Sequence, residues 1–280
     1  MILKRWSESA VNSRLKLVEE CLTNPDIHQR WASLYYMAVE NEKFFELAFD
    51  YIASVLSAPK NSIILDAGCG KCAHSIRLAN RGFLVQAVDF SETVLKEAET
   101  NVKAKGLEDK ISIRRENILS LSFEDETFKY VFCWAVLMHI PDLETAISEL
   151  TRVLKLGGML VIGENNMYSL ESRILHNPRW LARKNNVSVE KTPAGIEYWH
   201  TTSDGTMITR HTNVQWLIEG FKSKGLTVKK HVVRQFTKLH LSFSSPLLKN
   251  LIHGFNNFWF RYIKIPYPAL GNLIILQKEG

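Results

Sequence analysis

The amino-acid sequence predicts an α/β fold built on a doubly wound, mostly parallel sheet of seven strands. Short apolar runs alternate with segments of helical spacing along most of the chain, and glycine or polar residues separate them. A strand followed by a helix and then another strand needs a crossover, and such units build parallel sheets. The 280 residues suffice for one such domain with a modest elaboration.

Five apolar runs in the first part of the chain are predicted to be buried strands, and two further strands close the sheet. Three helices are expected between them, the second of which should end before Gly157 and Gly158. Ser91 is a suitable N-cap for the first of these helices. The strands are expected at residues 62–66, 83–89, 111–114, 130–134, 159–163, 226–234 and 272–277, and the helices at 91–105, 143–154 and 213–224.

Two regions depart from this alternation. Residues 1–58 are helical in pattern and rich in aromatic side chains. Residues 165–210 form a long polar and aromatic insertion after the fifth strand. Because an insertion of this length at the C-terminal end of a strand is usually functional, we expect both regions to cover a site at that edge of the sheet.

The net charge of +6 is unevenly distributed. Residues 1–164 carry 19 Lys and Arg against 23 Asp and Glu, whereas residues 165–240 carry 12 against 5 and the last forty residues carry 4 against 1. The basic excess indicates either a solvated surface or a site for an anionic partner. The solvated surface is favoured, because many of these lysines fall where a surface helix and a strand edge are predicted.

Composition and short motifs exclude several classes. The longest unbroken apolar stretch, residues 131–138, is far too short for a transmembrane helix, and no cleavable signal sequence is visible. Four cysteines in a chain of this length do not describe a secreted disulfide framework. We therefore expect a cytoplasmic protein without a transmembrane segment.

A glycine-rich loop follows the first predicted strand. Gly68 and Gly70 allow the backbone to turn sharply and to approach a ligand closely, with the N-terminus of a helix behind them. Asp89 ends the second predicted strand, nineteen residues after Gly70. An acidic residue about 20 positions after such a loop binds a ribose diol in nucleotide-binding α/β folds.

The same loop distinguishes between cofactors. The third glycine of a dinucleotide fingerprint is absent, since Lys71, Cys72 and Ala73 follow Gly70. Asp66, just before the glycines, would repel a pyrophosphate but suits a ligand with a cationic amino group and a sulfonium. The loop therefore favours S-adenosylmethionine over NAD.

Residues 61–163 resemble the class I S-adenosylmethionine-dependent methyltransferases. The resemblance lies in residues 63–70, which are similar to the first motif of this family, and in 87–91, 132–139 and 154–160, which are similar to later motifs in the same order. It implies a Rossmann-like methyltransferase fold with N-terminal helices, an inserted cap after strand five, and S-adenosylmethionine as the cofactor. Three positions depart from the family pattern, namely Cys72, Asn117 and Lys129.

The resemblance also implies roles for individual residues. Asp89 would bind the ribose hydroxyls, Phe90 would pack on the adenine, and Asn117 would hydrogen-bond the adenine amino group. With Asp66 from the loop, the predicted cofactor-binding residues are Asp66, Gly68, Gly70, Asp89, Phe90, Asn117, Ile118, Trp134 and Ala135.

The acceptor side is predicted from the flanking regions. His139, after the fourth strand, is the first candidate for a general base and His200 the second, although each histidine can equally be a structural residue. Aromatic and basic residues of the flanking regions are predicted to bind the substrate, with helix core as the alternative for the first two: Tyr35, Tyr36, Tyr198, Trp199, Arg210 and His211. No metal is expected, because the pair Cys69 and Cys72 lacks a second pair at zinc spacing.

These observations predict a methyltransferase that acts on an oxygen or nitrogen nucleophile of a small molecule, such as a biosynthetic intermediate, a sugar or a short peptide. The alternatives are a nucleic-acid methyltransferase and a non-catalytic partner subunit that binds S-adenosylmethionine. Residues 133–135 do not match the Asn/Asp-Pro-Pro-aromatic loop of base-amino methylation, so nucleic acid is disfavoured.

We expect four parts along the chain. They are an N-terminal helical cap at residues 1–58, an S-adenosylmethionine-binding core at 59–164, a substrate-binding insertion at 165–212, and the closing helix and strands at 213–280. The aromatic and basic residues at 247–268 are expected to pack beneath the last strands, with contact to a membrane surface as the alternative.

Overall fold

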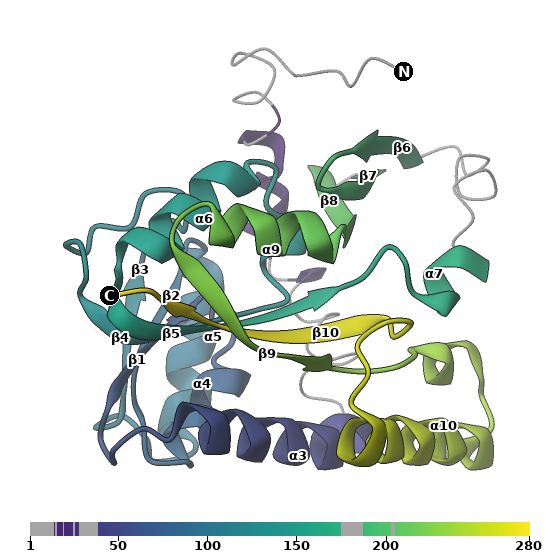
Figure 1. Ribbon diagram of the computed structural model, residues 1–280, viewed down its shortest axis with the longest axis horizontal. Helices are drawn as coiled ribbons and strands as arrows, with labels where there is room; N and C mark the ends of the chain where they lie inside the picture. Colours follow the sequence, from purple (N-terminus) through teal and green to yellow (C-terminus); the bar gives the residue numbers. More distant parts are fainter. Residues whose placement is uncertain are drawn as a thin grey trace.

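The computed structural model describes residues 14, 16–18, 20–24, 26–27, 39–174, 187–202 and 205–280. Its main sheet has seven strands in the order β3-β2-β1-β4-β5-β10-β9 (Figure 1). Only β10 runs antiparallel to its neighbours, β5 and β9, and the other paired strands are parallel. The predicted fold class is therefore confirmed.

The seven predicted strands and three predicted helices are all present. The strands are β1 (Ile63–Ala67), β2 (Leu84–Asp89), β3 (Ile111–Arg115), β4 (Phe128–Trp134), β5 (Leu154–Asn165), β9 (Leu226–Val233) and β10 (Gly271–Lys278). The helices on the sheet are α3 (Val39–Leu56), α4 (Ala73–Ala79), α5 (Glu92–Lys103), α6 (Leu143–Arg152) and α9 (Val214–Lys222). One boundary differs: β5 starts at Leu154, so Gly157 and Gly158 lie inside a strand rather than between a helix and a strand.

The sheet separates two hydrophobic cores. Alternate strand residues such as Phe132 face α3, α4 and α5 on one side, whereas their neighbours such as Val131 face α6 and α9 on the other. Strands buried on both faces are typical of parallel sheets, and this explains the unbroken apolar runs in the sequence. Within the described residues, no helix is long and apolar enough to cross a membrane.

A second sheet, which the sequence pattern did not reveal, follows β5. After α7 (Leu170–Ile174), the strands β6 (Val187–Thr192), β7 (Gly195–Thr202) and β8 (Gly205–Thr212) form an antiparallel sheet in that order (Figure 1). Gly195 has φ +147°, and a Cβ at this position would overlap the carbonyl oxygen of His211. The glycine therefore permits the tight turn from β6 to β7.

α10 (Pro246–Phe258) and the π-helical turn η4 (Trp259–Ile263) lie beside α3 (Figure 1). Phe260 is buried, with its ring 5.6 Å from that of Phe44 and 5.8 Å from that of Tyr51. This part of the aromatic segment packs against the core as expected, but Phe258 and Tyr262 are exposed.

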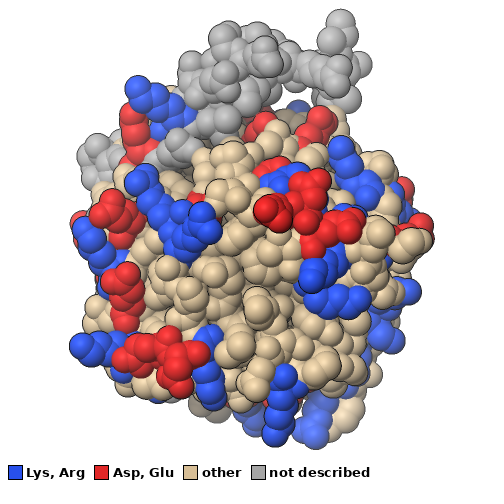
Figure 2. Space-filling view, turned by 90° about the vertical axis from the view of Figure 1, so that its left-hand side faces the viewer, with Lys and Arg blue, Asp and Glu red and all other residues tan. Residues whose placement is uncertain are grey.

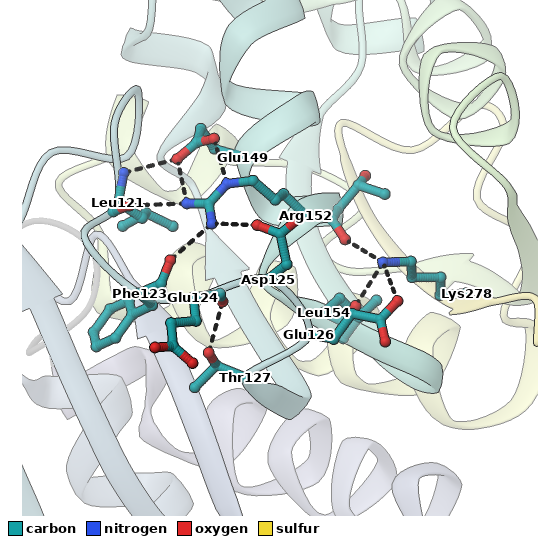
Figure 3. Close-up of polar contacts among 11 residues, drawn as sticks. Leu121, Phe123, Glu124, Asp125, Glu126, Thr127, Glu149, Arg152, Leu154 and Lys278 are labelled. Carbon is teal, nitrogen blue, oxygen red and sulfur yellow. Dashed lines mark hydrogen bonds and ion pairs between the residues drawn. The ribbon is translucent and has the colours of Figure 1, made fainter.

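Arg152, the last residue of α6, connects three segments at the end of the sheet opposite to the glycine loop (Figure 3). Its guanidinium donates to the carbonyl oxygens of Leu121 and Phe123 at 2.8 and 2.7 Å and pairs with Asp125 and Glu149. Lys278, at the end of β10, donates to the carbonyl oxygens of Thr151 and Leu154 nearby. Together the two cations satisfy carbonyl groups that the end of α6 and the loop before β4 leave unpaired.

Replacing Arg152 with methionine should lower the free energy of unfolding by about 2 kcal/mol, because several carbonyl and carboxylate groups lose a charged donor. Urea unfolding followed by circular dichroism measures the change. Lys222→Ala is the control, because its pair with Glu219 is exposed and should contribute less than about 0.5 kcal/mol. Equal stability of the wild type and the Arg152 variant would show that the cluster carries no net stabilisation.

Candidate active site

A cavity of about 750 Å³ lies at the C-terminal ends of the central strands. The floor of the cavity is formed by residues that follow β1, β2, β4 and β5. Its walls are formed by Leu22 and the start of α3, by the sheet of β7 and β8, and by residues that follow β9. Open α/β sheets bind ligands at this edge, where the strand order reverses between β1 and β4.

The glycine loop lines one end of the cavity. Gly68 has φ +87°, and its N–H donates to the carbonyl oxygen of Val88 at 2.8 Å. A Cβ on Gly68 would overlap the side chain of Val136, so both the backbone conformation and the space require glycine. The loop thus brings its backbone close to a ligand in the cavity.

Asp89 fixes this loop and also lines the cavity. One carboxylate oxygen accepts the N–H of Gly70 at 3.0 Å, and the other accepts the N–H of Ser91 at 3.0 Å. Each carboxylate oxygen has a second lone pair that can accept from a hydroxyl group. The end of β2 therefore presents a carboxylate suited to a vicinal diol.

The residues predicted to bind adenine lie beyond Asp89. Phe90 and Ile118 line the cavity together with Glu116, whose carboxylate accepts from the backbone and the hydroxyl of Ser122. Asn117 lines a smaller adjoining pocket that shares Phe90 and Glu116 with the cavity, and its side-chain oxygen accepts the N–H of Leu119. The cavity thus continues between these side chains.

Trp134 and Ala135, at the end of β4, line the cavity on the other side of the glycine loop. Ala135 has φ +57°, and its N–H donates to the carbonyl oxygen of Gly163 at 2.7 Å. This residue with left-handed backbone conformation follows the end of β4, and it lines the same cavity as Gly68 and Gly70.

Asp66, predicted to bind the cofactor, lies behind the cavity wall. Its carboxylate is buried, accepts from the hydroxyl of Ser75 at 2.6 Å, and is not among the described lining residues. Burial raises the pKa of Asp66 to about 7. The residue joins the end of β1 to α4, and any effect on a ligand is exerted through the loop.

The raised pKa of Asp66 predicts a stability change with pH. The folded chain keeps a proton that the unfolded chain releases near pH 4, so this contribution to stability is present at low pH and is lost as the pH rises to about 7. In this window the free energy of unfolding should fall by up to about 1.4 kcal/mol per pH unit because of Asp66. Asp66→Asn should remove this contribution. Urea unfolding between pH 5 and 8 measures it, with exposed Asp109→Asn as the control. Parallel stability curves for wild type and Asp66→Asn would contradict the prediction.

His139 ends the short helix η2 (Leu137–His139) after β4 and lines the cavity. Its Nδ1 is 2.8 Å from the carbonyl oxygen of Ile208 in β8. Because a carbonyl oxygen only accepts, Nδ1 carries the proton, and Nε2 is the basic nitrogen of the neutral ring. The small sheet therefore fixes both the orientation and the tautomer of His139.

The strand alternation of the small sheet decides which predicted substrate residues reach the cavity. Tyr198 and His200 of β7 line it, as do Thr209 and His211 of β8. The rings of Tyr198 and His211 are 4.8 Å apart, and burial raises the pKa of Tyr198. Ser172 lies 3.1 Å from Nδ1 of His211 and connects it to α7.

Trp199 and Arg210, also predicted to bind the substrate, are not among the described lining residues. The side chain of Trp199 lies in a cluster with Val18 and Leu22 and donates to Glu197 at 3.1 Å. Arg210 is fully buried, pairs with Glu197 at 2.9 Å and donates to backbone carbonyls of the β4–α6 connection. Neighbouring strand residues face opposite sides of a sheet, so both residues hold the small sheet in place. Tyr35 and Tyr36 lie outside the described residues.

Basic residues after β9 line the cavity as well, and the sequence offered no motif that could identify them. Arg234 is 6% exposed, and its Nε has no hydrogen-bond partner among the described residues. Burial lowers the pKa of Arg234 to about 10. Burial and the nearby charge of Arg234 lower the pKa of Lys238 to about 8. Glu171 of α7 accepts from the backbone N–H of Lys238 and from the hydroxyl of Thr237.

The neighbourhood of Arg234 contains two further titratable groups with shifted pKa values. The guanidinium lies 5.2 Å from the centre of the Trp134 ring, and burial lowers the pKa of nearby His74 well below its usual value. Burial raises the pKa of Glu164, at the end of β5, to about 7. This end of the cavity thus combines the cations Arg234 and Lys238 with the carboxyl groups of Glu164 and Glu171.

The cysteines of the glycine loop are buried thiols. Burial raises the pKa of Cys69 well above its usual value, so the thiolate is disfavoured. In the part of the chain that the structure describes, no group of three or more His, Cys, Asp or Glu side chains could hold a metal ion.

The described residues fit S-adenosylmethionine. The close backbone approach at Gly68 suits its methionine part, the Asp89 carboxylate suits its ribose diol, and the space between Phe90 and Ile118 suits a flat purine. A cavity of about 750 Å³ also exceeds what the cofactor alone would fill, and the remainder leads to His139 and Arg234.

Sequence comparison identifies the central part of the chain. A family model described as "Methyltransferase domain" matches residues 65–162. The chain is 36% identical over 121 residues to a demethylmenaquinone methyltransferase of Bacillus pumilus, covering 42% of this chain and 51% of that protein. It is 31% identical over 102 residues to the methyltransferase GfsG of Streptomyces halstedii, covering 36% of this chain and 37% of that protein. The chain spans about half the length of the first curated relatives that it matches.

Solved structures share the fold at low sequence identity. A SAM-dependent methyltransferase from Methanosarcina mazei superposes with a TM-score of 0.56 at 23% identity, covering 81% of this chain and 97% of the other. A geranyl diphosphate methyltransferase solved with SAM gives a TM-score of 0.56 at 17% identity, covering 83% and 85%. The family model, the strand order and the glycine loop agree: residues 65–162 match a methyltransferase domain, in a fold that the chain shares with SAM-dependent methyltransferases of known structure.

Proposed function

We propose that the chain transfers a methyl group from S-adenosylmethionine to an oxygen or nitrogen nucleophile of an anionic small molecule. The observation that carries this proposal is the continuity of one cavity, which joins the glycine loop and Asp89 to His139 and Arg234. A cofactor and an acceptor can therefore share a space that protein covers on several sides. Such enclosure orients the reacting groups and excludes water, and both effects favour methyl transfer.

His139 is the proposed general base. S-adenosylmethionine, when bound, supplies a methyl group on a sulfonium, and a neutral acceptor hydroxyl must lose its proton during the transfer. The bond from Nδ1 to the carbonyl of Ile208 leaves Nε2 as the atom that accepts this proton. His200 lines the same cavity and is the second candidate.

The anionic character of the acceptor is inferred from Arg234 and Lys238. A buried guanidinium without a hydrogen-bond partner on Nε is costly, and a carboxylate or phosphate of a ligand would offset this cost. Both cations line the same cavity, Arg234 over the ring of Trp134 and Lys238 next to Glu171 of α7. An acceptor anion at this place would hold its nucleophile within the covered part of the cavity.

Arg234→Met should raise the KM of an acidic acceptor at least tenfold, because one charge-assisted hydrogen bond is worth about 1.5–3 kcal/mol. The affinity for S-adenosylhomocysteine should change little. A loss of S-adenosylhomocysteine affinity without a loss for methylthioadenosine, which lacks the carboxylate, would instead assign Arg234 to the cofactor. Steady-state kinetics and calorimetry separate the two outcomes.

The function is tested with methyl-labelled S-adenosylmethionine and a small-molecule extract separated into acidic and neutral fractions. We expect a labelled product from the acidic fraction, and its absence with the His139→Ala variant. Label in RNA or DNA would favour the nucleic-acid alternative. Tight binding of S-adenosylhomocysteine without transfer to any fraction would favour a non-catalytic partner subunit.

A further inference from the structure

A stripe of apolar side chains faces solvent along α10 and the turn that follows it. Leu247, Leu251, Phe258 and Tyr262 are 69, 62, 53 and 65% exposed, and Phe255 is also exposed. Their spacing places them on one side of the helix. A surface helix of a globular protein normally turns this side toward the core.

The inward side of α10 is polar instead. His253 is buried with its ring 4.4 Å from that of His240. Asn256 is buried and exchanges two hydrogen bonds with the backbone of Thr237, at 3.0 and 2.9 Å. These bonds fix the rotation of the helix, so the apolar stripe cannot turn inward without breaking them.

Neighbouring segments extend the stripe into a surface. Residues 241–267 and 168–174 contain thirteen of the sixteen large apolar side chains that are exposed in the described part of the chain. The two segments are adjacent: the N–H of Leu170 donates to the carbonyl oxygen of Pro268 at 3.0 Å, and the rings of Tyr168 and Tyr267 are 6.3 Å apart. We call these two segments the α10 surface; a patch of this kind marks an interaction site.

The charged side chains of residues 241–267 are all cations, and Glu171 of the second segment accepts hydrogen bonds from Thr237 and Lys238. Residues 220–278 contain no Asp or Glu, whereas Lys249, Arg261 and Lys264 lie within or beside the stripe. On the neighbouring α3, three acidic residues pair with Arg77 of α4 and with Arg81, which follows α4, rather than with these cations. By contrast, Figure 2 shows cations and acids side by side on the end of the molecule away from α10.

We propose that the α10 surface binds the anionic surface of a phospholipid bilayer, with the apolar stripe in the acyl–headgroup boundary and the cations at lipid phosphates. An exposed apolar helix face that carries cations and no acidic residue of its own is the pattern of interfacial membrane helices. A second copy of the chain fits less well, because two such surfaces would bring like charges together.

The position of this surface relates it to the cavity. Leu241 is 42% exposed on the α10 surface and also lines the cavity, as does the adjacent Ser242. A bilayer bound here would therefore face one wall of the cavity. This consequence rests on the proposed function and indicates an acceptor that partitions into lipid, whereas membrane binding itself does not depend on activity.

The test is flotation of the full chain with vesicles of phosphatidylcholine alone or with about one third phosphatidylglycerol. We expect binding to the anionic vesicles and at least tenfold weaker binding of the double variant Leu251→Glu/Phe258→Glu. Leu156→Glu is the matched control, because Leu156 is 52% exposed at the start of β5, outside the surface. Arg261→Gln/Lys264→Gln should weaken binding to anionic vesicles while the apolar stripe stays intact.

Several results would overturn the proposal. Absence of the folded wild type from the floating fraction of both vesicles would do so, and this measurement needs no variant. Equal binding to neutral and anionic vesicles would remove the role of the cations. A concentration-dependent dimer in light scattering that Phe258→Glu abolishes, without vesicle binding, would assign the surface to a second copy.

Discussion

Replacing His139 with alanine should lower kcat by about 10²-fold or more for a hydroxyl acceptor, with little change in the affinity for S-adenosylhomocysteine. The reason is geometric: the bond to Ile208 fixes the proton on Nδ1, and Nε2 is then the basic atom of a ring that lines the cavity. The rate of the wild type should also fall at low pH, because a protonated imidazole cannot accept a proton. Initial-rate kinetics with the acceptor found in the labelling experiment measure both effects.

His139→Asn separates a chemical role from a positioning role. An asparagine amide can donate to the carbonyl of Ile208 as Nδ1 does, but it cannot act as a base. The rate should therefore stay low in both variants. Recovery of the rate in His139→Asn would show that the histidine only holds the small sheet against η2, and attention would move to His200 or to an acceptor that needs no base.

Replacing Asp89 with alanine should weaken S-adenosylhomocysteine binding by about 1–3 kcal/mol, or roughly fivefold to more than a hundredfold. The change removes acceptors for the ribose hydroxyls and also the two bonds that hold Gly70 and Ser91. Equilibrium dialysis with labelled S-adenosylhomocysteine measures it.

Asp89→Asn is the informative partner of this variant. One amide oxygen can still hold the N–H of Gly70, while the acceptor for one ribose hydroxyl is lost. Its affinity should therefore fall between those of the wild type and Asp89→Ala. Wild-type affinity in a folded Asp89→Ala chain would refute the role of this carboxylate.

The main sheet could be predicted from the sequence because its central strands are apolar runs bordered by a helix pattern or by glycine. Which core each residue of such a run joins is set by the structure, as for the neighbours Val131 and Phe132, because both are apolar. The small sheet could not be predicted in the same way. Its strands mix polar and aromatic residues on both faces, since one face lines the cavity and the other carries buried charges such as Arg210 and Glu197.

The same distinction holds for the site. Gly68 and Asp89 follow local motifs, so their positions could be predicted from spacing alone. Arg210 was predicted to bind the substrate because it is a cation in the insertion. Its position in β8 instead places its side chain on the face of the small sheet that pairs with Glu197. Arg234 reaches the cavity only because β9 lies beyond β10 at the edge of the sheet, and no spacing in the sequence encodes that approach.

The central claim is that this cavity binds S-adenosylmethionine beside an acceptor, and calorimetric titration of the full chain with S-adenosylhomocysteine tests it most directly. We expect one saturable site per chain. Its affinity should be reduced in Asp89→Ala and unchanged in Leu156→Glu, which changes an exposed residue outside the cavity and outside the α10 surface. Absence of saturable heat in a folded chain at ligand concentrations up to about 1 mM, which corresponds to a binding free energy weaker than about 4 kcal/mol, would contradict the account.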